Sequence, residues 1–305
     1  MAGKILKISL LTLLLFGAVG AAALYRYERQ QRAFWAAPAR APATLPPAGS
    51  TEIFVLGTVH FPTPAFTADS LYNALEALRP DLILFEIDST RLAEVLRPPA
   101  PMQRLSRALG WAASPNEAPA VTKYRQRYPA TLVRPYEWGR RDQFHRQHGI
   151  LTTPGLVFQK LNTLRKAGQL TPRQRQILAT YDSLTASLNA LGSTQPLAVL
   201  NSVATDSLAQ RRQNCQYHQL KTIVDENEEL REFRAFYQVN EQYWDIRNQA
   251  MARNIARYAA LYPGRRLVVL SGFNHRYYLR RELLKRAAKL HFRLRELADL
   301  APPAR

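Results

Sequence analysis

Two histidines in this sequence each follow a glycine by three positions at the end of an apolar segment. The first stands in "LGTVHF", where His60 follows Gly57, and the second in "SGFNH", where His275 follows Gly272. A glycine that leaves a strand can adopt positive φ and turn the backbone sharply, so we expect each imidazole to point back over the sheet edge. Imidazole is a common metal ligand, and the repeated spacing therefore predicts one shared site.

Acidic residues end two further strand-like segments. "LILFEID" supplies Glu86 and Asp88, and "LVRPYEW" supplies Glu137. Because open parallel sheets bind ligands at the carboxyl ends of their strands, we expect these carboxylates near the histidines. Two histidines and one carboxylate there would suit zinc, manganese, iron or cobalt, with positions left open for water and substrate. Taken singly, His60 is equally typical of a surface turn, and the "FEID" carboxylate of a helix cap before residues 89–95.

An arginine lies on a strongly helical segment, residues 243–264, just before the last long strand. On the inward side of that helix, Arg247 would clamp an anion or stabilise charge developing on a carbonyl or phosphoryl oxygen, with Asn248 assisting from the flank. The alternative interpretation is an exposed guanidinium paired with Asp245 or Glu241. The remaining histidines stand in polar, helical or terminal contexts and are interpreted as solvated: His145, His148, His218 and His291.

Strand-like and helix-like segments alternate along the chain, which predicts an α/β fold with a mainly parallel sheet covered by helices. Between the first two strands, leucines at helical spacing predict a helix over 67–78, capped by Thr67 or Asp69. Residues 139–242 show helical periodicity and no convincing strand, which predicts a large helical insertion. The expected strands are 52–57, 81–87, 130–138, 265–272 and 291–297.

Composition narrows the classes of function. The chain has 305 residues, 47% of them hydrophobic, and a net charge of +19, which favours contact with anionic surfaces. Nucleic-acid binding is not expected, because no recognised motif accompanies the basic residues. The single Cys215 excludes an intrachain disulfide and a cysteine metal cluster. No HExxH, Gly-x-Ser-x-Gly, Walker A or Gly-x-Gly-x-x-Gly motif occurs, and Ser271 is interpreted as a turn residue rather than a nucleophile.

The N-terminal segment indicates export or membrane attachment. Lys4 and Lys7 precede an uncharged run over residues 8–24, and three arginines follow at once. The run fits a membrane anchor or a signal peptide, and the arginines, which disfavour clean cleavage, favour the uncleaved anchor.

The chain is expected to divide into three parts. Residues 1–34 form the N-terminal hydrophobic helix that anchors or exports the protein. Residues 35–50 are rich in Ala and Pro and predict a semi-rigid linker. Residues 51–305 form the folded α/β domain, including the insertion over 139–242.

Four of these segments together resemble a known family. "LGTVHF", "LILFEID", "WDIRNQAMARNIA" and "LVVLSGFNHRYYLRREL" resemble the TIKI/TraB (PrgY, GumN-like) superfamily, which is related to the erythromycin-esterase and ChaN-like proteins. The resemblance covers about 51–95 and 240–300. It implies a functional set formed by the two Gly-x-x-His motifs with Glu86 and Arg247. Some members of that superfamily are metal-dependent, membrane-anchored proteases.

The expected function is therefore a membrane-tethered, metal-dependent hydrolase of peptidase or esterase type that acts outside the cytoplasm, at a bacterial inner membrane. A divalent ion (Mn, Co or Zn) would be held by His60, His275 and Glu86, while Arg247 stabilises the oxyanion. Glu137 is the reserve ligand or general base. The alternative is a protein that binds a peptide, haem or another anionic ligand in the same cleft without turnover.

Overall fold

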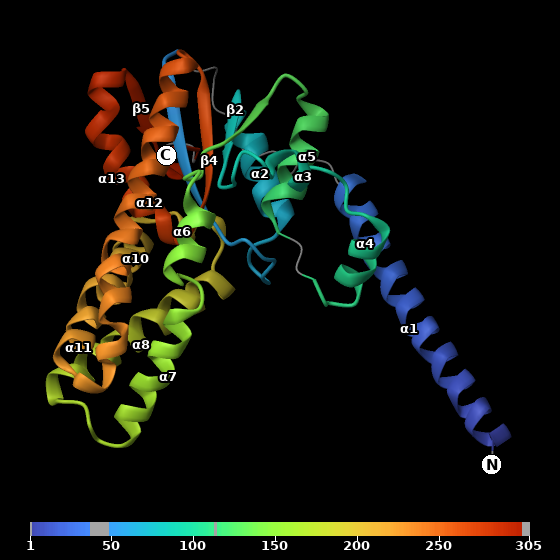
Figure 1. The fold of residues 1–305 in the computed structure, drawn as a ribbon. Helices are drawn as coiled ribbons and strands as arrows, with labels where there is room; N and C mark the ends of the chain where they lie inside the picture. The colour runs from blue at the N-terminus through green and yellow to red at the C-terminus, as the bar shows by residue number, and fades with distance from the viewer. Residues whose placement is uncertain (1, 37–48, 113–114, 301–305) are drawn as a thin grey trace.

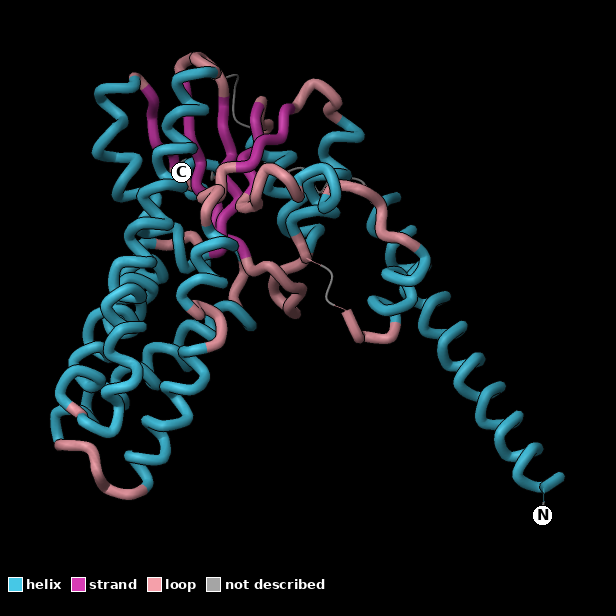
Figure 2. Tube along the Cα trace, viewed as in Figure 1, coloured by secondary structure: helices cyan, strands magenta, loops and turns pink. Residues whose placement is uncertain are grey.

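The computed structural model describes residues 2–36, 49–112 and 115–300, with side chains of the first helix described from residue 15 onward. A parallel sheet lies between helices, and the helices from α6 (Arg141–His148) to α12 (Arg234–Leu261) extend below it (Figure 1). The first helix, α1 (Ala2–Ala36), runs downward at the side of the domain beside α4 (Pro101–Ala108). The layers are easiest to follow in Figure 2, where the magenta strands stand between cyan helices.

The five strands form one sheet in the order β3-β2-β4-β1-β5, and every neighbouring pair is parallel. Although β4 comes late in the sequence, it lies between β1 and β2, and its register places Ser271 opposite Gly57. The mainly parallel sheet covered by helices is thus confirmed. The strands are β1 Thr51–Thr58, β2 Leu82–Phe85, β3 Leu132–Pro135, β4 Arg266–Gly272 and β5 Phe292–Arg295.

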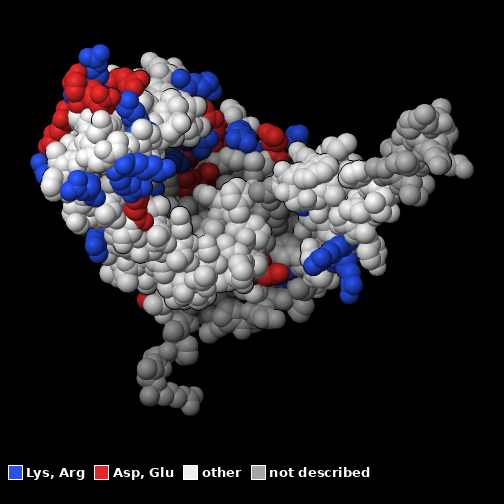
Figure 3. Space-filling model, turned by 90° about the horizontal axis from the view of Figure 1, so that it is seen from below, with Lys and Arg blue, Asp and Glu red and all other residues white. Residues whose placement is uncertain are grey.

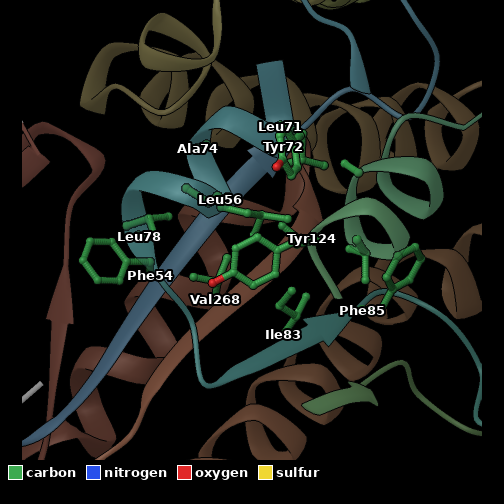
Figure 4. Close-up of a cluster of buried hydrophobic side chains, with 14 of the residues drawn as sticks. Phe54, Leu56, Leu71, Tyr72, Ala74, Leu78, Ile83, Phe85, Tyr124 and Val268 are labelled. Carbon is green, nitrogen blue, oxygen red and sulfur yellow. The ribbon is translucent and has the colours of Figure 1, made fainter. Parts of the chain in front are cut away.

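Both faces of the sheet are buried, which explains why its strands read as continuous apolar runs. Alternate residues of β1 point to opposite faces: Phe54 and Leu56 pack with α2 (Ala68–Leu78) and α5 (Glu117–Arg127), as Figure 4 shows in part. On the other face, Ile53 and Val55 pack with α12 (Arg234–Leu261) and α13 (Phe273–Leu290). The sheet is therefore the fixed middle layer on which the strand-end residues stand.

The first helix after β1 begins where the sequence predicts. The Thr67 hydroxyl accepts a hydrogen bond from the Ser70 amide, so Thr67 is the N-cap of α2, while Asp69 lies in the first turn. At the other end, Arg79 adopts φ 50° and closes the helix before β2.

Among the described residues, every element between β3 and β4 is helical, as expected for the insertion. These helices share a core of their own that includes Leu161, Leu178 and Leu220. The last of them, α12, begins at Arg234 rather than near 243, so the arginine-bearing helix is continuous with the insertion. The preceding elements are α6 Arg141–His148, α7 Thr153–Lys166, α8 Pro172–Thr194, α9 Leu197–Leu200, α10 Val203–Asn214, a π-helix Cys215–Gln219, α11 Leu220–Glu226 and a 3-10 helix Glu228–Phe233.

The N-terminal segment forms one helix, α1 (Ala2–Ala36), and the short helices α3 (Leu92–Val95) and α4 (Pro101–Ala108) precede α5. Glu28 of α1 pairs with Arg104 of α4 at 2.8 Å. Much of the uncharged run 8–24 and most of the linker 35–50 lie outside the described side chains and residues. Within the part that is described, no helix has both the length and the apolar character needed to cross a membrane.

Candidate functional site

Four neighbouring strands bring their carboxyl ends to one edge of the sheet, which we call the site edge. Each of these ends supplies one candidate: Glu137 lies two residues after β3, Glu86 directly after β2, His275 in the first turn of α13 after β4, and His60 two residues after β1. A fifth residue, Arg247, reaches the same place from α12. The site edge therefore assembles the residues that the sequence predicts.

The Arg247 guanidinium is the centre of this group. Its Nη2 donates to Glu86 Oε1 at 2.7 Å and to Glu137 Oε2 at 2.6 Å, and its Nε donates to Glu137 Oε1 at 3.1 Å. Its Nη1 donates to His275 Nε2 at 3.0 Å. These contacts occupy four of the five N–H bonds of the guanidinium and leave one on Nη1, while the Tyr243 hydroxyl also interacts with Arg247.

A chain of hydrogen bonds fixes the tautomer of His275. The Asn248 Nδ2 donates to the Trp244 carbonyl at 2.7 Å, which turns Asn248 Oδ1 toward His275 Nδ1, also at 2.7 Å. The Nδ1 atom must therefore carry the hydrogen, and Nε2 must be the acceptor that receives Arg247 Nη1. The Trp244 ring stacks on one face of the imidazole, with 4.3 Å between the ring centroids. His275 is thus held neutral, with its free electron pair at Nε2.

The charges follow from burial and from these contacts. Burial, together with the Arg247 charge, lowers the pKa of His275 to about 3. Burial alone would raise the pKa of Glu86. His275, which is protonated at the low pH where Glu86 titrates, opposes this effect together with Arg247 and His60 and lowers the pKa to about 2. Glu86 Oε2 also accepts from the Gly272 amide at 2.8 Å and from Ser271 Oγ at 3.0 Å. Glu86 is therefore ionised at neutral pH beside a neutral imidazole.

His60 has a different environment. Its Nδ1 lies 2.8 Å from Glu117 Oε1, and its side chain is 51% exposed, against 6% for Glu117. The hydrogen bond to Glu117 raises the pKa of His60 to about 9, although partial burial opposes the shift. His60 is therefore charged at neutral pH, with Nδ1 bonded to a carboxylate.

The two motif glycines are required for close approach rather than for positive φ, which corrects the conformational reason given above. Among the described residues, the positive-φ glycines are Gly110, Gly149, Gly168 and Gly264. A Cβ at Gly57 would lie 2.9 Å from Phe273 Cβ, and a Cβ at Gly272 would lie 3.1 Å from His60 Nε2. The lack of a side chain at Gly272 thus lets His60 approach β4 and Glu86.

The predicted carboxylates separate into different roles. Glu137 accepts from Arg247, from Arg141 Nη1 at 3.0 Å and from the Trp138 amide at 2.8 Å. These contacts favour a role in holding Arg247 over metal ligation or proton abstraction. Asp88 instead accepts from the amide and hydroxyl of Thr90, as a local turn residue does.

Two surface interpretations are wrong. Arg247 is 12% exposed and pairs with Glu86 and Glu137, not with Asp245 or Glu241. His145 is not simply solvated, because its Nε2 lies 2.6 Å from the Tyr243 hydroxyl beside the site. Both errors arise because the face of a helix turned toward a sheet edge can be polar where it meets a site.

Sequence reasoning missed Glu117, the carboxylate that orients His60. It stands at the start of α5, and its Oε1 also accepts from Thr58 Oγ1 at 2.6 Å. Among the described residues, the only nearby polar side chain that shares this carboxylate is Thr58, which ends β1 two residues before His60. The sequence separation of 57 residues between His60 and Glu117 offers no local signal.

The donor set can be compared with what a metal ion needs. Both imidazoles have Nδ1 bonded to a fixed acceptor, the usual arrangement behind metal-ligating histidines, and His275 Nε2 lies 3.6 Å from Glu86 Oε1. The donor types therefore suit a divalent ion. As the side chains stand, however, no three His, Cys, Asp or Glu within the described part of the chain are grouped to hold one.

Comparison with known proteins leaves the site without an inherited role. No protein-family model matches this chain, and neither curated proteins nor solved structures give a match.

Proposed function

We propose that this chain is a membrane-tethered hydrolase that cleaves an amide or ester bond at the site edge, outside the cytoplasm. The observation that carries the proposal is the meeting of two imidazoles, an ionised carboxylate and a guanidinium at the ends of adjacent parallel strands. Burying charged groups costs desolvation free energy, and buried groups with strongly shifted pKa values concentrate at functional sites.

The proposed cofactor is a divalent metal ion held by His60, His275 and Glu86, through the two Nε2 atoms and a Glu86 oxygen. Such an ion supplies Lewis-acid polarisation of a carbonyl and a more acidic water molecule. Arg247 now bonds His275 Nε2 and Glu86 Oε1, and His60 is protonated at neutral pH. Ligation therefore requires the guanidinium to release these two atoms and His60 Nε2 to lose its proton. Its two bonds to Glu137 provide a place to which it can withdraw.

In this proposal the chain's own residues divide the work. Glu117 and Asn248 orient the two imidazoles, and Glu137 holds the guanidinium. The remaining Nη1 hydrogen of Arg247 donates to the oxygen on which charge grows as the carbonyl is attacked. Arg247→Lys should retain the fold and lose about 3 kcal/mol of transition-state stabilisation, roughly a hundredfold in turnover.

The experiment that tests the proposal is metal analysis of the purified full-length chain, followed by a peptide and ester hydrolysis screen with and without chelator. His60→Ala and His275→Ala should each lower metal content and activity. His218→Ala is the matched control, because His218 is exposed on the insertion. His291 is a poorer control, because it adopts φ 53°, where alanine is strained. Equal metal content in all variants would count against the metal site.

One observation favours the non-catalytic alternative, a binding cleft for a peptide, haem or another anionic ligand. Arg247 already neutralises Glu86 and contacts His275, so the site is electrostatically complete without a metal ion. On this view the free Nη1 hydrogen of Arg247 would bind the ligand's oxygen. Tight ligand binding by the metal-free chain, without product formation, would support this alternative.

A further inference from the structure

Exposed apolar side chains gather on the segments that leave the site edge. Phe61 follows His60 in the loop after β1, and Met102 and Trp111 lie on and just after α4. Leu151 lies between α6 and α7, and Leu156 lies in the first turn of α7. Trp111 is 78% exposed and Met102 is 71% exposed. Large exposed apolar side chains that gather on one face usually mark an interaction surface.

The opposite edge of the sheet, where the strands begin, is different. Its connections carry exposed charges: Arg265 pairs with Asp81 at 3.1 Å, and Arg79 stands at the end of α2. The two edges are separated by the length of β1, eight residues or about 26 Å. Phe61, Met102, Trp111, Leu151 and Leu156 therefore belong to segments that leave the site edge, whereas Leu261 is an exposed leucine at the far edge.

The first helix leaves the domain on that same side. In Figure 1 the N-terminal end of α1 and the far end of the helical insertion both extend below the sheet, the direction in which the strands end. Figure 3 looks at this face from below: uncharged atoms cover much of its middle, charged side chains gather toward one end, and the surface is hollowed between them. The α4 segment lies along α1, joined to it by the Arg104–Glu28 pair.

We propose that this face lies against the surface of the bilayer that holds α1, so that the site acts on bonds presented by molecules held in that membrane. The inference rests on the proposed tether through residues 8–24. Arg26, Arg29 and Arg32 follow that run and would meet anionic headgroups, which attract basic side chains near the surface. Exposed Trp111 and Met102 are side chains that suit the interfacial layer.

The bilayer explains two features that a free surface does not. Exposed tryptophan and phenylalanine beside a polar site cost free energy in water, and the cost falls when they enter the interfacial layer. In Figure 1, α1 and the helical insertion also extend below the sheet in the same direction, toward the side on which the bilayer would lie. The substrate class is accordingly a membrane-held molecule that carries an ester or amide near the headgroups.

Energy transfer to a labelled lipid tests the orientation. The full-length chain is reconstituted in vesicles of phosphatidylethanolamine and phosphatidylglycerol that contain a rhodamine-headgroup lipid. A donor dye is placed at Phe61→Cys on the site edge or at Leu261→Cys at the far edge, positions that are 53% and 57% exposed. Cys215 is 1% exposed, so the unmodified chain is the labelling blank.

Transfer from position 61 should be at least about twice that from position 261, because about 26 Å separates the edges. Equal or greater transfer from position 261 overturns the orientation, even if the chain is an active hydrolase. If the chain does not float with the vesicles in a density gradient, both the tether and the orientation are overturned. The hydrolase proposal is then still decided by the separate hydrolysis screen. A second pair, Met102→Cys and Leu284→Cys, replaces the first if either variant fails to fold.

Discussion

His60 and His275 close the same Gly-x-x-His spacing, yet their surroundings are opposite. His60 is half-exposed and bonded to a carboxylate, and its pKa is raised to about 9. His275 is buried between an amide and a guanidinium, and its pKa is lowered to about 3. The spacing therefore determines where an imidazole stands, while the partner of its ring nitrogens determines its charge.

The largest expected effect comes from removing the guanidinium beside His275. Arg247→Met leaves Glu86 and Glu137 buried without their common partner, which should cost about 3–5 kcal/mol of unfolding free energy. Arg253→Met on the exposed side of the same helix is the control and should change stability by about 0.5 kcal/mol or less. Chemical denaturation of both variants provides the measurement. Similar stabilities for the two would mean that the cluster around Arg247 is not formed.

The motif glycines should differ from each other as well. Gly57→Ala places a methyl group 2.9 Å from Phe273 Cβ, inside the packed sheet, and should cost about 1–3 kcal/mol. Gly272→Ala meets the end of the half-exposed His60 side chain, which can move away, so its cost should be smaller. Gly155→Ala, a helical position with no atom within 4 Å, should gain up to about 1 kcal/mol. Thermal melting ranks the three, and a Gly57→Ala variant as stable as Gly155→Ala would contradict this packing.

Replacing Asn248, the Nδ1 partner of His275, by a carboxylate should raise the pKa of His275 toward that of His60. Asn248→Asp places a carboxylate against Nδ1, where Glu117 stands against His60, so the pKa of His275 should rise by more than about one pH unit. Histidine-ring NMR followed through a pH titration from about pH 3 to pH 8 measures the change. Gln249→Glu adds the same charge on the exposed neighbouring position and should leave the ring resonances nearly unchanged. An unchanged pKa of His275 in the Asp variant would refute the dependence of its pKa on the group that faces Nδ1.

The smallest effect concerns the pH dependence of stability at His60. Its pKa in the folded protein, about 9, exceeds the ordinary value of 6.5, so the ion pair with Glu117 stabilises the fold fully below about pH 6.5. This stabilisation is lost as the pH rises through about 9, and half-exposure keeps it under about 1 kcal/mol. The stability difference between the parent and Glu117→Gln should therefore shrink between about pH 6 and pH 10. A stability difference that grows with pH would mean that Glu117 does not raise the pKa of His60.

Much of the fold could be predicted because buried parallel strands have a strong local pattern. The apolar runs of β1 and β4 and the leucine spacing of α2 identify these elements without tertiary information. The strand order is less accessible, because β4 enters between β1 and β2 through contacts distant in sequence.

The candidate site was predictable to the extent that it sits at strand ends. His60, Glu86, Glu137 and His275 follow their strands within a few residues, and the topology brings them together. Protonation and pairing were not predictable. Glu117 and Asn248 set the state of the two imidazoles through contacts that no local pattern encodes.

The central place of β4 has a consequence for how the protein is made. A nascent chain that ends before Arg266 already contains β1 and β2, but it lacks the strand that joins them. Its sheet cannot close, and neither His275 nor the anchor for Glu86 at Gly272 exists yet. The site edge is therefore assembled only in the last stage of synthesis, so a prematurely terminated product lacks the contacts that bring Glu86, Arg247 and His275 together.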